Sequence, residues 1–182
     1  GLAAEHDDWV MLYQYGNPAN PRAHYEGTAE EIVRDCPEVD VFVAGLGTGG
    51  TLMGCSQRLK EHRPDVRIVA CEPLQGDPVS GLRSLEDGFV PPILDLSRLD
   101  RKLLVSNRDS IVMTRRLAVE EGIFAGVSSG AVIHTCVRLA SRMTRGTIVG
   151  IVCDGGWKYL SAGIWTDDVD EVEETLDRGV FW

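Results

Sequence analysis

The sequence is short of positive charge, and this shortage excludes two classes of partner. Its 182 residues carry 18 Lys and Arg against 28 Asp and Glu, which gives a formal net charge of −10. Nucleic acids and anionic membranes bind to proteins through cationic faces. We therefore expect neither a nucleic acid nor a membrane as the partner of this chain.

Long apolar runs, a leader segment and paired cysteines are also missing. No window approaches the length of a membrane span, and the first eight residues have neither the basic nor the apolar region of a secretory leader. The five cysteines form no C-x-x-C pair and no metal-ligand spacing. We interpret them as free thiols of a reducing compartment, which predicts a cytoplasmic protein without a metal site.

Short apolar strands alternate with helical patterns along the chain, and no repeat, low-complexity tract or linker divides it. This alternation predicts an α/β fold with a mostly parallel sheet flanked by helices. We expect one α/β domain over residues 1–165, followed by a helix and tail over 166–182. Strands are expected at residues 9–15, 41–44, 66–71, 102–105 and 147–153.

A glycine-rich loop follows the apolar strand at residues 41–44. Gly47, Gly49 and Gly50 allow the backbone to turn sharply and to aim several N–H groups at one point, where the next helix adds its dipole. The loop therefore predicts a phosphate site. Residues 45–50 also satisfy the dinucleotide fingerprint G-x-G-x-x-G, with Glu72 at the end of the next strand, so a nucleotide, a smaller phosphate ester and a plain tight turn remain open on this stretch.

Two later loops should reach the same edge of the sheet. Loops that follow Ala44, Ala125 and Cys153 would emerge together in a parallel sheet, so Thr48, Ser128 and Asp154 are expected to line one crevice.

Helix ends and turns are predicted from local signals. One of Ser128 and Ser129 is also expected to cap the helix that follows, as Thr28 is for a helix near residue 30. Prolines and asparagines over residues 16–21 predict a turn that stops regular structure.

These segments resemble the cysteine synthases, which belong to the fold type II pyridoxal-phosphate enzymes, and the resemblance covers essentially the whole chain. Residues 47–51 resemble the loop that holds the cofactor phosphate, which implies cofactor contacts from Gly47, Thr48, Gly49, Gly50 and Thr51. Residues 126–131 resemble the turn that presents a serine, here Ser128, to the pyridine nitrogen. Gln14, within a segment similar to Q-F-x-N-P-A-N-P, is implied to meet the carboxylate side of the substrate.

The finer resemblance is to the O-phosphoserine-dependent type, through residues 9–18, 82–91 and 156–161. It implies that Arg83 recognises the substrate phosphate, a role that suits the two-pronged guanidinium. The implied reaction is β-replacement: O-phosphoserine or O-acetylserine loses its leaving group, and a sulfur nucleophile attacks the aminoacrylate to give L-cysteine. The implied partners are a sulfur donor, such as a thiocarboxylated small carrier protein, and a second copy in a homodimer, and the tail at 176–182 is implied to act as a lid.

The lysine that carries the cofactor in this family is missing. Lys60, Lys102 and Lys158 stand in other contexts, and the family's asparagine loop for the substrate carboxylate is absent too. The resemblance therefore implies a C-terminal portion: the closing strand of the small domain and the second half of the large domain. Ala29 replaces a usual glycine and is expected to alter the start of that helix.

Alternative functions remain open at this point. The first is another fold type II enzyme, such as a serine/threonine dehydratase or a cystathionine β-synthase. The second is a non-catalytic dimerisation or binding module that keeps the fold. A nucleotide-binding protein is the third, and the long loop over 73–92 fits any of them.

Overall fold

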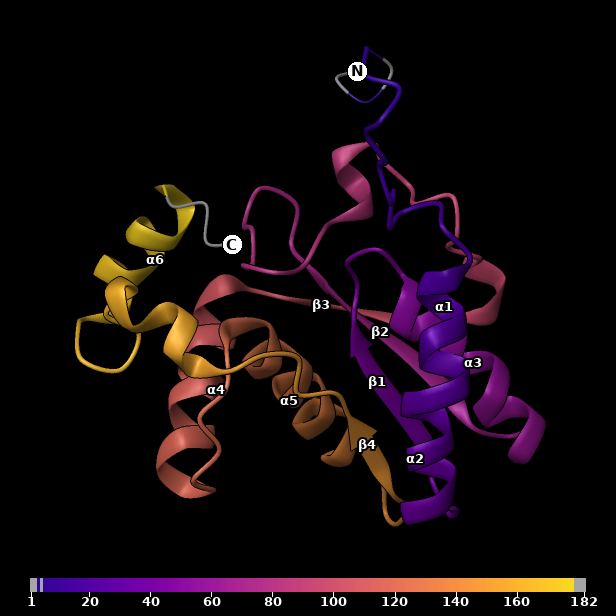
Figure 1. Ribbon diagram of the computed structural model, residues 1–182. Coiled ribbons are helices and arrows are strands. Elements are labelled where there is room, and N and C mark those ends of the chain that lie inside the picture. The colour runs from indigo at the N-terminus through magenta and orange to yellow at the C-terminus, as the bar shows by residue number, and fades with distance from the viewer. Residues whose placement is uncertain (1–2, 4, 179–182) are drawn as a thin grey trace.

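A parallel sheet of four strands lies at the centre of the computed structural model, which describes residues 3 and 5–178 (Figure 1). The strands are β1 (Val41–Gly45), β2 (Arg67–Pro73), β3 (Arg101–Val105) and β4 (Ile148–Gly150), in the order β3-β2-β1-β4. Val43 of β1 lies opposite Val69 of β2 and Gly150 of β4. The predicted α/β class with a parallel sheet is confirmed.

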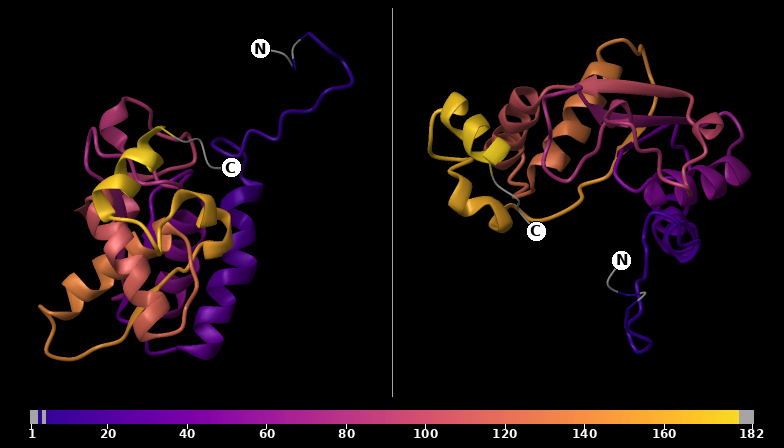
Figure 2. Two further views of the ribbon diagram at one scale, coloured as in Figure 1. Left: turned by 90° about the vertical axis from the view of Figure 1, so that its left-hand side faces the viewer. Right: turned by 90° about the horizontal axis from the view of Figure 1, so that it is seen from above.

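Helices cover both faces of this sheet (Figures 1 and 2). One face carries a continuous helical rod together with α3 (Gly50–His62). The rod, called the α1 rod below, consists of α1 (Ala19–Ala23), a π-helical turn (His24–Thr28) and α2 (Ala29–Asp35). The other carries α4 (Asn107–Glu120), α5 (Val127–Ala140) and α6 (Val169–Arg178). Short 3-10 helices occupy Leu85–Asp87, Leu96–Arg98 and Gly156–Ala162.

The continuous apolar run of β1 is explained by burial on both faces. Phe42 and Ala44 pack in the cluster beneath α3, whereas Val41 and Val43 pack in the cluster beneath α5. Successive side chains of a strand point to opposite faces, so a strand between two helical layers needs apolar residues at every position. This burial fixes β1, and with it the loop that follows.

The expected strand at residues 9–15 is wrong. The segment has no strand pairing, and Trp9, Val10 and Leu12 are 51%, 83% and 75% exposed. It runs away from the body of the molecule toward the amino terminus (Figure 2). An apolar pattern becomes a strand only where a neighbour accepts its backbone hydrogen bonds, and the described part of the chain supplies none here.

The expected turn over residues 16–21 is found only in its first half, where the Gly16 and Asn17 N–H groups both bond the Tyr13 carbonyl, whereas residues 19–21 are helical. The expected cap at Thr28 is wrong. The helical rod begins at Ala19, because Pro18 is at its N-cap and Pro21 falls in the first turn, where backbone N–H groups have no helical partner anyway. Thr28 is itself helical, with φ −50° and ψ −45°, and its side chain caps nothing. Ala29 is the first residue of α2, which continues directly from the π-helical turn, and its expected effect on this helix start stays a prediction.

The last strand is shorter than residues 147–153. β4 ends at Gly150, and Ala125 forms only an isolated antiparallel bridge with Gly155. Within the described chain β4 is an edge strand with one neighbour, β1, and all three of its residues are only half-buried. Unpaired edges are where strands shorten.

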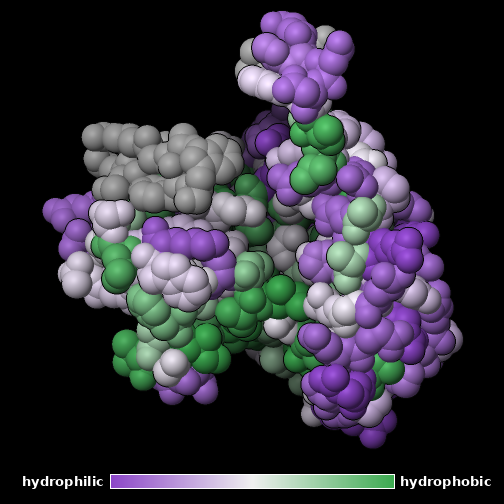
Figure 3. Space-filling view, in the orientation of Figure 1, coloured by the Kyte–Doolittle hydropathy of each residue, from purple (hydrophilic) through white to green (hydrophobic). Residues whose placement is uncertain are grey.

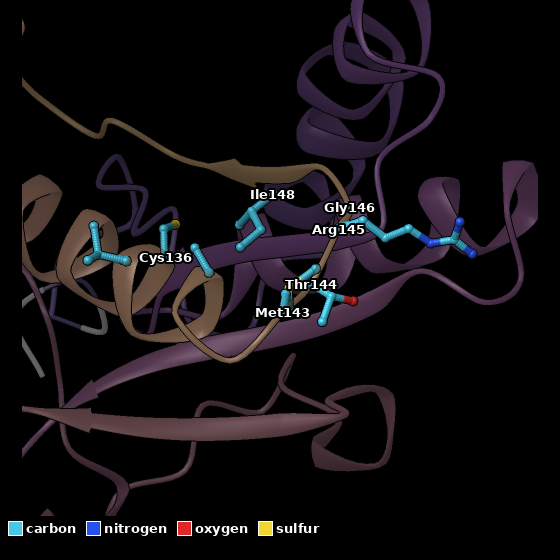
Figure 4. A pocket seen from close by; sticks show the side chains of 8 residues that line it. Cys136, Met143, Thr144, Arg145, Gly146 and Ile148 are labelled. Atoms are coloured by element: carbon cyan, nitrogen blue, oxygen red, sulfur yellow. The ribbon is translucent and has the colours of Figure 1, made fainter.

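An open apolar hollow of about 350 Å³ lies between α5 and β4 (Figure 4). Cys136, Met143 and Ile148 line it, and the side chain of Arg145 extends away from it. The apolar residues of α5 and the turn after it are therefore divided: Val132 and Leu139 are buried, whereas Cys136, Ala140 and Met143 face the hollow. In the orientation of Figure 1, apolar surface gathers near the middle of the molecule (Figure 3).

None of the helices over the described residues is long and apolar enough to cross a membrane. All five cysteines carry free thiols, and Cys55 and Cys71 are buried.

Candidate active site

A cavity of about 760 Å³ opens at the carboxyl ends of β1 and β2. All of the residues singled out from the sequence for cofactor or substrate line it: Gln14, Gly47, Thr48, Gly49, Gly50, Thr51, Arg83 and Ser128. Its other walls are Tyr15, Gly45, residues 78–82, Cys153, Asp154 and Leu176. Thr48, Ser128 and Asp154 all line this cavity, which confirms the crevice predicted for them.

The loop between β1 and α3 forms a cradle of backbone N–H groups. Gly49 has φ +87°, a left-handed conformation that favours glycine, and α3 begins at the next residue. A side chain at Gly50 would overlap the amide of Asn20. The first amides of α3 have no carbonyl within the helix to bond, and the helix dipole adds positive potential at this end. The cradle is therefore built for an anion.

The threonine hydroxyls of the cradle are oriented by the α1 rod. Thr48 Oγ1 accepts hydrogen bonds from Asn20 Nδ2 at 3.0 Å and from the Gly50 N–H at 3.2 Å. With its lone pairs occupied by two donors, the Thr48 hydroxyl has its proton left for a ligand. Asn20 Nδ2 also donates to the Gln14 carbonyl at 2.8 Å, which ties Gln14 to the same wall.

Thr51 is held by a half-buried imidazole. Its Oγ1 lies 3.2 Å from His24 Nε2, and His24 Nδ1 lies 3.1 Å from Thr28 Oγ1. Burial lowers the pKa of His24 below its ordinary value of 6.5. The imidazole is therefore neutral at pH 7, with one ring nitrogen to donate and one to accept.

Ser128 lies in the first turn of α5 and is only 4% exposed. The expected serine cap is wrong, because Gly126 is the N-cap and no side chain caps this helix. Ser129 Oγ instead accepts the Cys153 N–H at 2.9 Å and joins α5 to the loop after β4. Burial raises the pKa of the Cys153 thiol, and a hydrogen bond with the Ser128 hydroxyl opposes that shift.

Asp154 forms an acidic part of the cavity wall. Its Oδ2 accepts the Tyr159 hydroxyl at 3.0 Å and lies 3.5 Å from Lys158 Nζ. Its Oδ1 is buried and has no hydrogen-bond partner in the described part of the chain. Burial raises the pKa of Tyr159 to about 12, and the Asp154 charge adds to that shift.

Arg83 sits between two aromatic rings at the cavity wall. Its Cζ lies 5.5 Å from the centroid of Tyr15 and 5.3 Å from that of Phe89, and these two rings meet edge-to-face at 5.3 Å. The backbone N–H of Arg83 donates to the Leu46 carbonyl at 2.7 Å, which fixes the loop that carries Arg83 to the cradle. Among the described residues no carboxylate pairs with Arg83, and it is the one Lys or Arg that lines the cavity.

The sequence did not point to the residues that hold this arginine. Tyr15 and Phe89 lie in two segments far apart in the chain, and no spacing rule links them. Asn20 and His24 lie in a segment that matched a family motif, but nothing in the motif itself showed which threonine each would contact. Only the close packing of the α1 rod on α3 reveals those pairs.

The three lysines of the chain all lie outside the cavity lining. Lys60 pairs with Asp100 at 2.9 Å, Lys102 with Glu72 at 2.9 Å, and Lys158 with Asp154 at 3.5 Å.

The acid proposed for a ribose is engaged elsewhere. Glu72 is fully buried, and besides its ion pair with Lys102 it accepts the Leu85 N–H at 2.7 Å. An internal ion pair of this kind leaves the dinucleotide interpretation without its ribose-binding acid.

An open parallel sheet with an anion cradle at the end of its first strand defines an α/β protein that binds a phosphate-bearing ligand. A sequence model of the family described as "Pyridoxal-phosphate dependent enzyme" matches residues 1–154. The chain belongs to this family, whose cofactor is pyridoxal 5′-phosphate.

Individual relatives agree with this assignment. The chain is 40% identical to "Cysteine synthase B" of Pseudomonas aeruginosa, over 85% of this chain and 52% of that protein. It is 40% identical to "O-ureido-L-serine synthase" of Streptomyces lavendulae, over 97% and 59%. A crystal structure of O-ureido-L-serine synthase superposes with a TM-score of 0.83 at 36% identity and covers 98% of this chain and 57% of that one. The chain thus spans between half and three-fifths of these relatives.

The described residues fit this cofactor. The cradle offers backbone amides and the Thr48 hydroxyl to a phosphate, and Ser128 presents a small neutral hydroxyl inside the same cavity. A volume of about 760 Å³ also lies within the range of small-molecule and cofactor sites.

Proposed function

We propose that this chain is the C-terminal portion of a cysteine synthase that uses O-phosphoserine, an O-phosphoserine sulfhydrylase making L-cysteine by β-replacement. The observation that carries the proposal is Arg83, a half-buried cation in the cavity wall that no described carboxylate neutralises. A guanidinium held in place by aromatic faces is prepared to receive an anionic group of a substrate.

The cofactor contacts follow from the cradle. Gly47, Thr48, Gly49, Gly50 and Thr51 would hold its phosphate, and Ser128 would meet its pyridine nitrogen. When bound, the cofactor supplies the electron withdrawal that lets a serine derivative lose its β-substituent. Because the Ser128 hydroxyl is neutral, it would not keep that nitrogen protonated as a carboxylate would, which favours elimination over transamination.

Arg83 and Gln14 would bind the substrate from one side of the cavity. The Arg83 fork can donate two hydrogen bonds to a phosphate leaving group, and Tyr15 and Phe89 limit how far it can swing. Gln14 lines the cavity near the same wall and would face the substrate carboxylate.

The remaining parts of the proposal concern chain outside the described residues. We propose that the lysine that carries the cofactor comes from polypeptide other than this chain, because none of Lys60, Lys102 and Lys158 lines the cavity and each pairs with a carboxylate. Leu176 of α6 reaches the cavity, and residues 179–182, which lie outside the described residues, would continue from there as a lid.

We also propose a sulfur donor, an assembly and a compartment. A thiocarboxylated carrier protein as donor, and a homodimer as the assembly, rest on the family resemblance. The cytoplasm fits five free thiols.

The test is Arg83→Met in the full-length enzyme, with kcat/KM measured for O-phosphoserine and for O-acetylserine. We expect kcat/KM for O-phosphoserine to fall by roughly 10- to 100-fold, the loss expected for a charge-assisted hydrogen-bond pair. The value for O-acetylserine should change little, because its leaving group carries no charge.

Arg98→Met is the matched control, since Arg98 ends the 3-10 helix Leu96–Arg98, does not line the cavity and pairs with Asp95 at 3.5 Å. It should leave both substrates unaffected. An equal loss on both substrates in Arg83→Met, or no loss on either, would contradict the proposal and favour another fold type II activity such as a dehydratase.

A further inference from the structure

A second, smaller hollow lies at the opposite end of the sheet from the candidate active site. It encloses about 240 Å³, and four arginines line it together with Leu103, Leu139 and Met143. Arg67 and Arg101 are the first residues of β2 and β3. Arg138 and Arg142 lie in the last turn of α5 and just beyond it.

These arginines are not neutralised by the protein. Arg138 Nη1 donates to the Leu104 carbonyl at 2.7 Å, and Arg67 Nη2 donates to the Met143 sulfur at 3.5 Å. Both acceptors are uncharged, and within the described residues none of the four arginines forms an ion pair. Elsewhere arginines do pair with carboxylates, namely Arg22, Arg34, Arg58, Arg63, Arg98, Arg108 and Arg116.

A shortage of carboxylates does not explain this grouping, because acids outnumber bases by 28 to 18 in the chain. Asp100, whose charge interacts with Arg67, is already engaged: Lys60 Nζ lies 2.9 Å and the Ile68 backbone nitrogen 2.8 Å from its Oδ2. Burial pushes the pKa of Asp100 up, but the Ile68 N–H, Lys60 and the charge of Arg67 together hold it below its ordinary value.

The helix dipole accounts for only half of the cluster. The C-terminal end of α5 attracts Arg138 and Arg142, as helix ends do for cations generally. Arg67 and Arg101 start parallel strands, where no comparable field exists. Four like charges around one small hollow repel one another, and a bound anion would remove that repulsion.

We propose that Arg67, Arg101, Arg138 and Arg142 form a binding site for a small oligophosphate. A hollow of about 240 Å³ is smaller than most sites for drug-sized ligands and suits a chain of two or three phosphates. Guanidinium forks match phosphate oxygens in pairs. The site is separate from the candidate active site, so the proposal does not depend on the proposed function.

The test is calorimetric titration of the full-length protein with inorganic triphosphate at low salt. We expect binding in the wild type, and Kd weakened by at least about tenfold in the double variant Arg101→Gln/Arg142→Gln. The side chains of these two arginines donate no hydrogen bond to another described residue, so their replacement should leave the fold intact, which circular dichroism and Tm would verify. Added salt should weaken wild-type binding steeply.

Two further variants locate the site. Arg22→Gln/Arg116→Gln removes the same charge from exposed arginines paired with glutamates, and it should leave Kd within about twofold. Arg83→Gln should also leave Kd unchanged, whereas a loss there would move the site to the active-site cavity. ATP distinguishes the source of the phosphates: affinity equal to that of triphosphate indicates the phosphate chain alone, and tighter binding indicates a nucleotide.

The proposal is overturned if triphosphate gives no heat of binding in the wild type. It is also overturned if the cluster variant binds as tightly as the wild type, or if the Arg22/Arg116 variant loses as much affinity as the cluster variant.

Discussion

Single side chains around the cradle are each held by a second contact. Thr48 is held by Asn20, Thr51 by His24, and Arg83 by two aromatic rings. Such support fixes the geometry before a ligand arrives, and binding then loses less conformational freedom. The residues in this supporting layer are therefore as informative as those that would touch the ligand.

His24 should make stability depend on pH. Its folded-state pKa lies below the ordinary 6.5, so the unfolded chain takes up a proton on acidification before the folded chain does. The stabilisation is present above about pH 6.5 and is lost as pH falls toward the folded pKa, with a slope no greater than about 1.4 kcal/mol per pH unit. His24→Gln should flatten that part of the curve in urea unfolding measured between about pH 5 and 8.

His62→Gln is the control, because His62 is exposed and its Nε2 lies 3.0 Å from the Pro37 carbonyl oxygen. Its curve should keep the wild-type slope near pH 6. Identical slopes in His24→Gln and the wild type would show that His24 does not carry the effect.

At the scale of elements, the cradle depends on how closely the α1 rod approaches α3. Gly54 of α3 permits this approach: a Cβ there would overlap the Pro21 carbonyl and crowd His24. The rod in turn brings Asn20 to Thr48 and His24 to Thr51. Gly54 lies inside a regular helix, so its backbone conformation does not require glycine. The glycine is needed because the two helices pack closely at this point.

Gly54→Ala should therefore separate the two helices. We expect a loss of about 1–3 kcal/mol in the free energy of unfolding, as for other overpacked sites. Cofactor affinity should fall as well, because Thr48 and Thr51 lose their supports. Chemical denaturation and cofactor titration would measure the two effects.

Gly27→Ala is the matched control within the rod. A Cβ at Gly27 meets nothing within 4 Å, so the substitution should be neutral or stabilise by up to about 1 kcal/mol. If Gly54→Ala behaved like Gly27→Ala, the close-approach argument would be wrong.

The elements that could be predicted are those specified by local residues. β1, α3 and the cradle between them follow from apolar residues 42–44 and three nearby glycines, and all came out as expected. Residues 9–15 failed because a strand needs a partner, which no local pattern reveals. Residues 19–21 were expected in a turn and are helical, because proline signals a turn and a helix start alike and only the contact of the rod with α3 decides between them.

The candidate site divides in the same way. Glycines and Ser128 could be found from loops that follow apolar segments, but the Tyr15–Arg83–Phe89 group could not, because its members come together only in three dimensions. Leu176 reached the cavity for the same reason, through the packing of α6 on α4.

At the scale of the whole molecule, an unpaired strand edge and an open apolar hollow lie side by side among the described residues. β4 pairs on one side only among the described strands, and the hollow beside it exposes Cys136, Met143 and Ile148. The relatives are up to about twice as long as the matched region. Both observations fit our proposal that the cofactor's lysine lies on polypeptide that this chain does not include.

Borohydride reduction tests that proposal directly. The 182-residue chain, incubated with pyridoxal 5′-phosphate and reduced, should keep an intact mass of 19.9 kDa, since none of its lysines lines the cavity. The full-length protein treated alike should gain one cofactor per chain. A stoichiometric adduct on Lys60, Lys102 or Lys158 of the shorter chain, located by peptide mapping, would sink the idea.

The π-helical turn at His24–Thr28 has a consequence for how this sequence can change over evolutionary time. In that turn the Ala29 N–H bonds the His24 carbonyl, five residues back, where a regular α-helix would bond four back. Deleting a single codon within the turn would restore a regular helix and rotate its two halves against each other by about 100°. Either Asn20 would leave Thr48 or Ala29 would leave the core. A one-residue change in the length of this rod would therefore disrupt the cradle even if every residue that contacts it were kept.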